Sequence, residues 1–293
     1  ESKSKMKKTA YEIVTDKLIE KLNEGVAPWS KPWSSDKYDT THATNLVSKE
    51  RYRGINRILI HCAGFDCPYW LTYKQAQSLG GNVRKGEKGT KIVFFSPIFL
   101  DANGNKVESK SEAASTKWFV RHYTVFNATQ CDGIDIPSVA AAPAVDHDPI
   151  EDCQGIIDSW ETKCEIHHGG DRAFYRPSAD TIRLPNLSQF NSPEEYYSTA
   201  FHEAIHATGH SSRLNRSSLT GKAAFGDAVY SKEELVAEIG AAFLCSEAGI
   251  ENKTLDNSAS YLKGWIDALK GDSRLAIQAA QAAEKAANHV LNR

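Results

Sequence analysis

Hydrophobic residues near the N-terminus recur at helical spacing. The stripe consists of Tyr11, Val14, Leu18 and Leu22, which lie three or four positions apart. Thr9 and Glu12 precede it in the order of a capping box, in which each side chain satisfies a backbone amide of the first turn. Gly25 and Pro28 follow the stripe and are typical of a helix end. The pattern therefore predicts a helix that starts at the capping box and stops before Gly25.

Further along the N-terminal half the pattern changes to that of strands. Residues 92–95 form a short apolar run, and residues 118–126 contain Phe119, Arg121, Tyr123 and Val125 at every second position. Both segments are predicted to be strands. Because a helix precedes them, this half of the chain is expected to be α+β.

Helical patterns dominate the second half. A helix is predicted from about Glu151 to Cys164, and the turn sequence Pro-Ser-Ala-Asp joins short strands at 173–176 and 181–184. Ser192 and Pro193 then provide an N-cap and a first helical residue, so a helix is expected from there to Gly209.

Three further helices are expected towards the C-terminus. Ser231 and Glu234 repeat the capping-box order and open a helix that ends near Gly249. Two more helices are predicted at about 258–270 and 272–291.

A change in composition separates the two halves. Residues 137–149 hold three prolines and several small residues without an amphipathic period, so they are predicted to be a linker. Residues 1–136 carry 21 Lys and Arg against 15 Asp and Glu, whereas the rest carries 14 against 22. We therefore expect an α+β protein of two domains, at 6–136 and 150–293, with different partners.

The composition excludes several classes of protein. Apolar residues make up 41% of the chain and charged residues 25%, as in globular proteins, and no run is long enough for a transmembrane helix. The N-terminal residues are polar, so we expect no signal peptide, no membrane partner and a cytoplasmic protein. The six cysteines contain no C-x-x-C pair and are expected to be free thiols.

Residues 202–206 carry the clearest chemical signal. They read His-Glu-Ala-Ile-His inside a predicted helix, where positions four apart lie on one face. His202 and His206 can therefore bind one metal ion, and Glu203 beside them can act as the general base that takes a proton from water. This is the H-E-x-x-H arrangement of zinc metallopeptidases.

Catalytic zinc needs a third protein ligand. A third histidine ten residues after the first is excluded because that position is Ser212, and His210 would reach the site only if the helix continued through Gly209. Residues 234–238 instead resemble the E-x-x-A-D pattern of gluzincin-type peptidases. The resemblance makes Glu234 the ligand and Glu238 a supporting acid. If Glu234 only completes a capping box, Glu238 is the alternative ligand.

One strand beside the motif admits two interpretations. Residues 181–185 could form an edge strand that pairs with an extended peptide, or an ordinary core strand.

Basic and aromatic residues gather in the N-terminal half. Residues 45–91 contain nine Lys and Arg but three acids, with Trp and Tyr interleaved. Cations that follow a phosphate backbone, and rings on which unpaired bases stack, are typical of single-stranded nucleic-acid binding. A glycine-rich basic loop at 80–89 lacks the Lys-Ser/Thr of a nucleotide-binding P-loop.

The motifs taken in order resemble the ArdC family of antirestriction proteins. In the N-terminal half they are residues 29–33, 51–56, 70–75, 80–89 and 125–130, a region also similar to TraC-type plasmid primases. In the C-terminal half they are residues 175–185, 202–210, 233–238 and 265–269, which resemble the zincin-like domain of the family.

The resemblance implies a plasmid protein that binds single-stranded DNA and protects incoming DNA from host restriction during conjugation. Its metal would be Zn²⁺, with Mn²⁺ possible, and a protein substrate would be unidentified. The expected DNA-binding residues are Trp29, Trp33, Arg51, Arg53, Asn56, Trp70, Lys74, Arg84, Lys85, Lys88 and Lys91.

Two alternatives remain open. The protein could shield DNA with a catalytically silent metal site, or it could be a DNA-tethered protease that acts on DNA-bound proteins. The presence of Glu203 favours a competent site.

Overall fold

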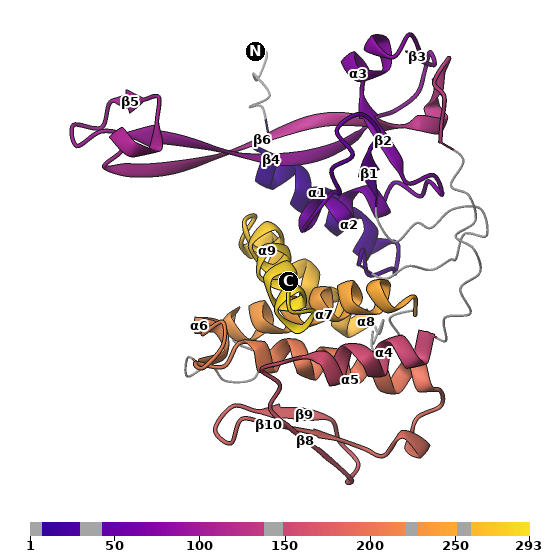
Figure 1. The fold of residues 1–293 in the computed structure, drawn as a ribbon, viewed down its shortest axis with the longest axis vertical. Helices are drawn as coiled ribbons and strands as arrows, with labels where there is room; N and C mark the ends of the chain where they lie inside the picture. The colour runs from indigo at the N-terminus through magenta and orange to yellow at the C-terminus, as the bar shows by residue number, and fades with distance from the viewer. Residues whose placement is uncertain (1–7, 30–42, 138–148, 221–227, 251–258) are drawn as a thin grey trace.

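The computed structural model describes residues 8–29, 43–137, 149–220, 228–250 and 259–293. The protein is α+β, as predicted. A large sheet from the N-terminal half lies at one end, and helices α1 and α2 follow beneath it (Figure 1). The C-terminal helices form the next layers, and a small sheet closes the other end.

The N-terminal half alternates short helices with strands. In chain order its elements are α1 (Ala10–Asn23), β1 (Thr44–Asn45), α2 (Ile55–His61), β2 (Tyr69–Thr72), α3 (Tyr73–Ser78), β3 (Asn82–Val83), β4 (Thr90–Leu100), β5 (Lys106–Val107), the 3-10 turn at Lys110–Glu112, β6 (Ser115–Asn127), the 3-10 turn at Ala128–Gln130 and β7 (Cys131–Asp132).

The first helix forms as the sequence predicts. The Thr9 hydroxyl accepts from the Glu12 amide at 3.2 Å, and the Glu12 carboxylate accepts from the Thr9 amide at 2.7 Å. Both halves of the capping box are therefore present. Val14, Leu18 and Leu22 are buried on one face of the helix.

The large sheet has the strand order β1-β2-β6-β4-β5. The predicted strands at 92–95 and 118–126 are the centres of β4 and β6, which are much longer than expected. These two strands pair antiparallel from Thr90 with Val125 to Leu100 with Ser115. They form a two-stranded ribbon that extends well past the rest of the sheet (Figure 1).

The C-terminal half is mainly helical. Its elements are α4 (Pro149–Ser159), β8 (Glu165–His168), β9 (Phe174–Arg176), β10 (Thr181–Leu184), the 3-10 turn at Leu187–Gln189, α5 (Pro193–Thr208), α6 (Ser217–Thr220), α7 (Ala228–Ala248), α8 (Ala259–Gly271) and α9 (Leu275–Val290). The last two helices match their predicted positions closely, and α5 starts at the predicted cap.

Two expectations for this half are wrong, and one open question is answered. Helix α4 ends at Ser159 rather than Cys164, because residues 165–168 join the small sheet as β8. Helix α7 already begins at Ala228, so Ser231 lies inside it and does not cap it. Of the two interpretations of the strand at 181–184, the core strand is confirmed, since β10 lies between β8 and β9 and pairs with both.

The two halves share a hydrophobic core. One continuous cluster contains Leu18 of α1 together with Leu262, Trp265 and Leu269 of α8. The hydroxyl of Thr15 also donates to the Ser273 carbonyl at 2.9 Å. The predicted linker at 137–149 falls almost wholly outside the described residues, and the domain boundaries stay a prediction.

The expectations for cysteines and membrane helices can also be compared with the structure. All six cysteines are free thiols, which confirms the prediction. Within the described part of the chain, no helix is long and apolar enough to cross a membrane.

The shared core makes Leu18 a test of how the halves are held together. Leu18→Ala removes a side chain that is 1% exposed, and such truncations cost about 2–5 kcal/mol. We expect this loss in the free energy of unfolding measured with urea. Lys17→Ala on the exposed side of α1 is the control and should change stability by less than about 0.5 kcal/mol. Equal stability of the two variants would contradict the shared core.

Candidate metal centre

Helix α5 brings the two motif histidines together. Ser192 caps the helix by accepting from the Glu195 amide at 3.3 Å, and Pro193 occupies its first turn. His202 and His206 therefore lie one turn apart on the same face, with their Nε2 atoms 3.1 Å apart.

Helix α7 supplies a carboxylate to the same point. Glu234 lies with Oε2 3.6 Å from His202 Nε2 and Oε1 3.4 Å from His206 Nε2. The approach of the helices depends on Gly240, where an added Cβ would lie 2.8 Å from side-chain atoms of the buried Ile205 on α5. The absence of a side chain at this position lets α7 pack closely against the motif helix.

The donor set fits a divalent metal ion. Ligand atoms of His202, His206 and Glu234 all lie within 4.8 Å of one another. In a tetrahedral site with zinc–nitrogen distances near 2.0–2.1 Å, neighbouring ligand atoms are about 3.3 Å apart. The three measured separations lie close to this value. Two imidazoles and one carboxylate are also the ligand types of gluzincin-like zinc sites.

Glu233, whose role the sequence interpretation missed, contacts the Nδ1 side of the His206 ring, away from the metal-facing Nε2. Its Oε1 lies 3.4 Å from His206 Nδ1, and a carboxylate can only accept, so the ring nitrogen donates. Arg216 holds both oxygens of Glu233, at 2.5 and 3.2 Å, and Ser218 donates to Oε2 at 2.5 Å. Arg216 also donates to the Ile205 carbonyl at 2.7 Å, which ties this network to α5.

Glu238 has the corresponding position beside His202. Its Oε1 lies 3.7 Å from His202 Nδ1, on the side of the ring away from Glu234. Its side chain is 4% exposed. This position suits a supporting acid better than the alternative ligand role.

The local field favours positive charge at the point where the donors meet. Burial opposes charge on His206, but hydrogen bonds with Glu233 and Glu234 outweigh it and raise its pKa to about 10. The pKa of His202 is also raised against burial, mainly by its hydrogen bond with Glu234. Burial would raise the pKa of Glu234, yet its hydrogen bonds with both histidines lower it far below the usual range. A divalent cation is favoured by the same field.

Glu203 follows His202 on α5 and is buried, with 8% of its surface exposed. Its charge is among the causes that raise the pKa of both motif histidines, which places the carboxylate close to them. His210, the remaining histidine considered as a ligand, is not in the donor group. His210 interacts instead with Ser212 at 2.8 Å and with Asp180 at 3.8 Å.

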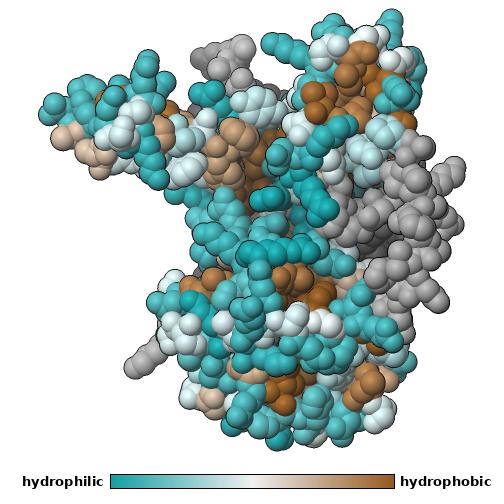
Figure 2. Space-filling view, viewed as in Figure 1, coloured by the Kyte–Doolittle hydropathy of each residue, from teal (hydrophilic) through white to brown (hydrophobic). Residues whose placement is uncertain are grey.

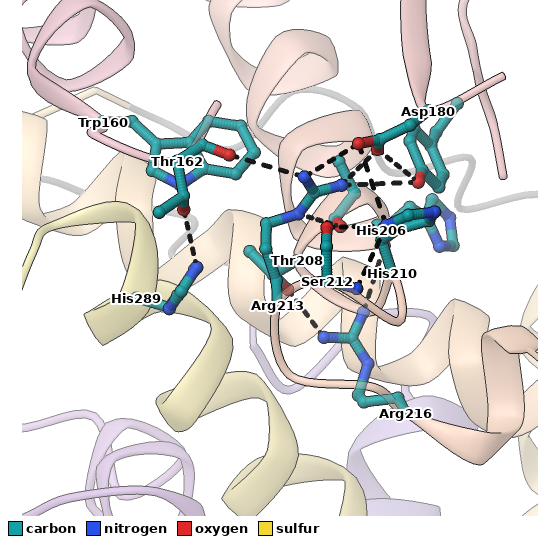
Figure 3. Close-up of polar contacts among 12 residues, drawn as sticks. Trp160, Thr162, Asp180, His206, Thr208, His210, Ser212, Arg213, Arg216 and His289 are labelled. Carbon is teal, nitrogen blue, oxygen red and sulfur yellow. Dashed lines mark hydrogen bonds and ion pairs between the residues drawn. The ribbon is translucent and has the colours of Figure 1, made fainter. Parts of the chain in front are cut away.

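Arg213 fixes the chain directly after the motif helix. Its guanidinium pairs with both oxygens of Asp180, and its Nε donates to the Ala207 carbonyl at 2.8 Å (Figure 3). Tyr175 donates to the same Asp180 at 2.8 Å. The turn between β9 and β10 is thereby joined to the C-terminal end of α5.

The expected DNA-binding residues have different surroundings. Trp29 and Trp70 are 6% and 1% exposed, so their expected role as stacking platforms is wrong in this structure. Trp29 packs edge-on against Trp265, and Trp70 against Phe65. Buried aromatic rings remove a large apolar area from water, so both side chains stabilise the core.

Asn56 is also structural. Its side-chain amide donates to the Val93 carbonyl and accepts from the Val93 amide, both at 2.8 Å. Trp33 lies outside the described residues. The expected residues that are exposed are Arg51, Arg53, Lys74, Arg84, Lys85, Lys88 and Lys91.

Two family models match the chain. Residues 8–126 match the N-terminal domain of anti-restriction factor ArdC, and residues 156–282 match a zincin-like metallopeptidase domain. Crystal structures of antirestriction ArdC protein from the R388 plasmid are similar over 97% of this chain. The metal-free form is 34% identical with a TM-score of 0.75 over 97% of its length, and the Mn(II)-bound form is 35% identical with 0.74 over 98%.

Three curated relatives are also similar. Two DNA primase TraC proteins of Escherichia coli are 38% and 39% identical over 97% and 98% of this chain, which spans 20% and 27% of their lengths. A protein of Sinorhizobium fredii, y4eC, is 33% identical over 95% of this chain and 90% of its own length.

Arg216 should tune metal affinity although it is no ligand. Arg216→Ala removes the two guanidinium hydrogen bonds, here called the fork, that hold Glu233 against His206. Losses of such supporting contacts weaken metal binding by about 10–100-fold. Arg216→Lys keeps the charge without the fork and should lie between wild type and the alanine variant. Competition with a chromophoric chelator measures the affinity; wild-type binding by Arg216→Ala would exclude this role.

Gly240→Ala should destabilise the protein although alanine favours helices. The propensity gain is about 1 kcal/mol, whereas overpacking against Ile205 costs about 1–3 kcal/mol. Gly264→Ala in α8 is the matched control, because nothing lies within 4 Å of its added Cβ, and it should be neutral or stabilising. Thermal unfolding of both variants measures whether each change in stability is positive or negative. A stabilising Gly240→Ala would contradict the close helix packing.

Proposed function

The chain belongs to the ArdC family of antirestriction proteins, and from this we propose that it binds single-stranded DNA and protects incoming plasmid DNA from host restriction during conjugation. We assign DNA binding to residues 6–136 and a metallopeptidase-type site to residues 150–293. The carrying observation is that one chain combines an ArdC N-terminal domain with the three-donor group of His202, His206 and Glu234.

Exposed cations of the N-terminal half support the DNA assignment. Lys88 and Lys91 lie beside α1 in a hollow of about 790 Å³, which Lys17 also lines. Two acids of α1, Asp16 and Glu20, line the hollow too. Glu20 pairs with Lys17 at 3.0 Å, so we assign phosphate contacts to the exposed Lys88 and Lys91, which would make DNA binding salt-dependent.

The metal centre is proposed to hold Zn²⁺ or Mn²⁺ through His202, His206 and Glu234. The Mn(II)-bound form of the R388 protein supports a divalent metal in this family, and the donor types suit zinc. Such an ion, when bound, acts as a Lewis acid towards a carbonyl group and makes water more acidic.

Glu203 is proposed as the general base. Its carboxylate accepts a proton from water and later passes it to the leaving amine of a cleaved peptide. Its place next to the ligand His202, away from bulk solvent, supports this role.

Separate variants distinguish metal binding from catalysis. Glu234→Ala removes a ligand and should abolish tight metal binding, whereas Glu203→Gln should retain the metal and lose any peptidase activity. Metal content is measured by elemental analysis. Peptidase activity is measured as cleavage of casein, in the presence and in the absence of single-stranded DNA. Glu161→Gln, at an exposed acid, is the control. If Glu203→Gln still protects transferred DNA fully, DNA protection does not require catalysis.

DNA binding should depend strongly on salt. Each phosphate contact with a single strand contributes a slope of about 0.7 in the plot of log affinity against log salt. Lys85→Ala combined with Lys88→Ala should therefore reduce the slope by about 1.4. Lys263→Ala with Lys270→Ala makes the same charge change on α8 and serves as the control. If the wild type does not bind single-stranded DNA, or binds it independently of salt, the DNA-binding proposal is wrong.

A further inference from the structure

The ribbon of β4 and β6 exposes an unusual set of side chains. Beyond the base of the sheet its two strands pair mainly with each other, and only the short β5 joins β4 near the tip. The ribbon extends away from the body of the protein (Figure 1). In the space-filling view its surface is a mixture of hydrophobic and hydrophilic side chains above an open concave outline (Figure 2).

Strand alternation assigns three of the exposed rings of the ribbon to one face. Phe119, Arg121 and Tyr123 stand at alternate positions of β6 and share a face. Phe94 of β4 is paired with Arg121 in the register and therefore stands on that face too. On the other face Val120 packs against the large core, as its neighbour Phe95 does.

The three rings of this face are unusually open to solvent. Phe94 is 57% exposed, Phe119 50% and Tyr123 45%. Phe94 and Tyr123 touch edge to face, with ring centroids 6.3 Å apart. Rings of this size contribute to stability only when buried, so a row of exposed ones indicates a binding surface.

The charge of the ribbon selects a negatively charged occupant. Its two strands carry Lys91, Lys117, Arg121 and one histidine, and no acid. Lys117 and Arg121 share the face of the three rings by alternation. Rings interleaved with cations on one face match a polymer with bases and phosphates.

The spacing of the rings favours a single strand over a duplex. They occupy three successive rows of the ribbon, and such rows are roughly 6.8 Å apart. Stacked bases of a duplex follow one another at about 3.4 Å, and their faces are covered by neighbouring bases. Only unstacked bases can lie against rings in this arrangement.

We propose that the face of the ribbon formed by Phe94, Phe119, Arg121 and Tyr123 is a stacking platform for the bases of single-stranded DNA. The inference rests on the proposed DNA-binding function and adds a surface whose four residues all lie outside the basic segment at 45–91. On this face the three rings contact the bases, and Lys117 and Arg121 contact the phosphates between the bases.

The test measures the affinity of the full chain for a short fluorescein-labelled oligothymidylate by fluorescence anisotropy. Phe94→Ala, Phe119→Ala and Tyr123→Ala should each weaken binding by about fivefold or more, since a stacked base is worth that much or more. Phe119→Trp keeps an aromatic ring at this position and should therefore retain the wild-type affinity. Thermal unfolding should match the wild type, because these side chains are exposed.

Trp118→Ala is the matched control. Trp118 lies on the same ribbon and is 63% exposed, but alternation puts it on the opposite face. Its removal should leave the affinity unchanged. A loss as large as that of Phe119→Ala would overturn the assignment to one face.

The remaining outcomes separate this inference from the function on which it rests. If the wild type does not bind the oligonucleotide, both fail. If it binds and the three ring variants bind equally well, the platform is wrong while DNA binding stands. Equal losses with a duplex probe, or a ribbon-dependent dimer in sedimentation, would also overturn the single-strand platform.

Discussion

The packing of α7 against α5 is the contact on which the candidate metal centre depends. The motif helix provides two histidines but no third donor, so the site is complete only when another helix approaches. Gly240 permits that approach because a larger residue would collide with Ile205, whose side chain is fully buried. Once the helices are in contact, the preceding turns of α7 place Glu234 between the two rings. A small residue that lies six positions after Glu234, or about 1.7 helical turns along α7, therefore sets the position of a ligand.

The same packing buries charge, and this constrains the surrounding residues. The side chains of Glu233 and Glu238 are each only 4% exposed. An unpaired carboxylate in such a place costs several kcal/mol, so its partners are part of the fold. Arg216 serves Glu233 with a two-point contact and reaches the backbone of α5 as well. The orientation of His206 thus depends on a cation from the chain that follows the motif, which no inspection of the motif itself indicates.

The sequence predicted the features that depend on neighbouring residues. Thr9 and Ser192 cap their helices because a cap needs only the first turn, and the motif histidines share a face through helical geometry alone. Features that depend on distant residues were missed, wrong or left open. The role of Glu233 depends on how α7 faces α5, and β10 became a central strand because β8 formed beside it. Trp29 looked available for DNA because its partner Trp265 lies 236 positions away, although the two rings are 6.1 Å apart.

Helix α7 also connects the metal centre to the N-terminal half. Arg57 of α2 lies over the ring of Phe243, 4.2 Å from its centroid, and burial lowers the pKa of this guanidinium. Arg57 belonged to the basic cluster in the sequence, yet its packing makes it a structural contact between the halves. Phe243 and Glu234 are nine residues apart, which is about 13.5 Å along a helix. Because an α-helix is stiff over this length, the position of α2 and the position of the ligand on α7 are mechanically linked. The N-terminal half is therefore part of the framework that holds the metal centre, and the stability of one half cannot be separated from that of the other.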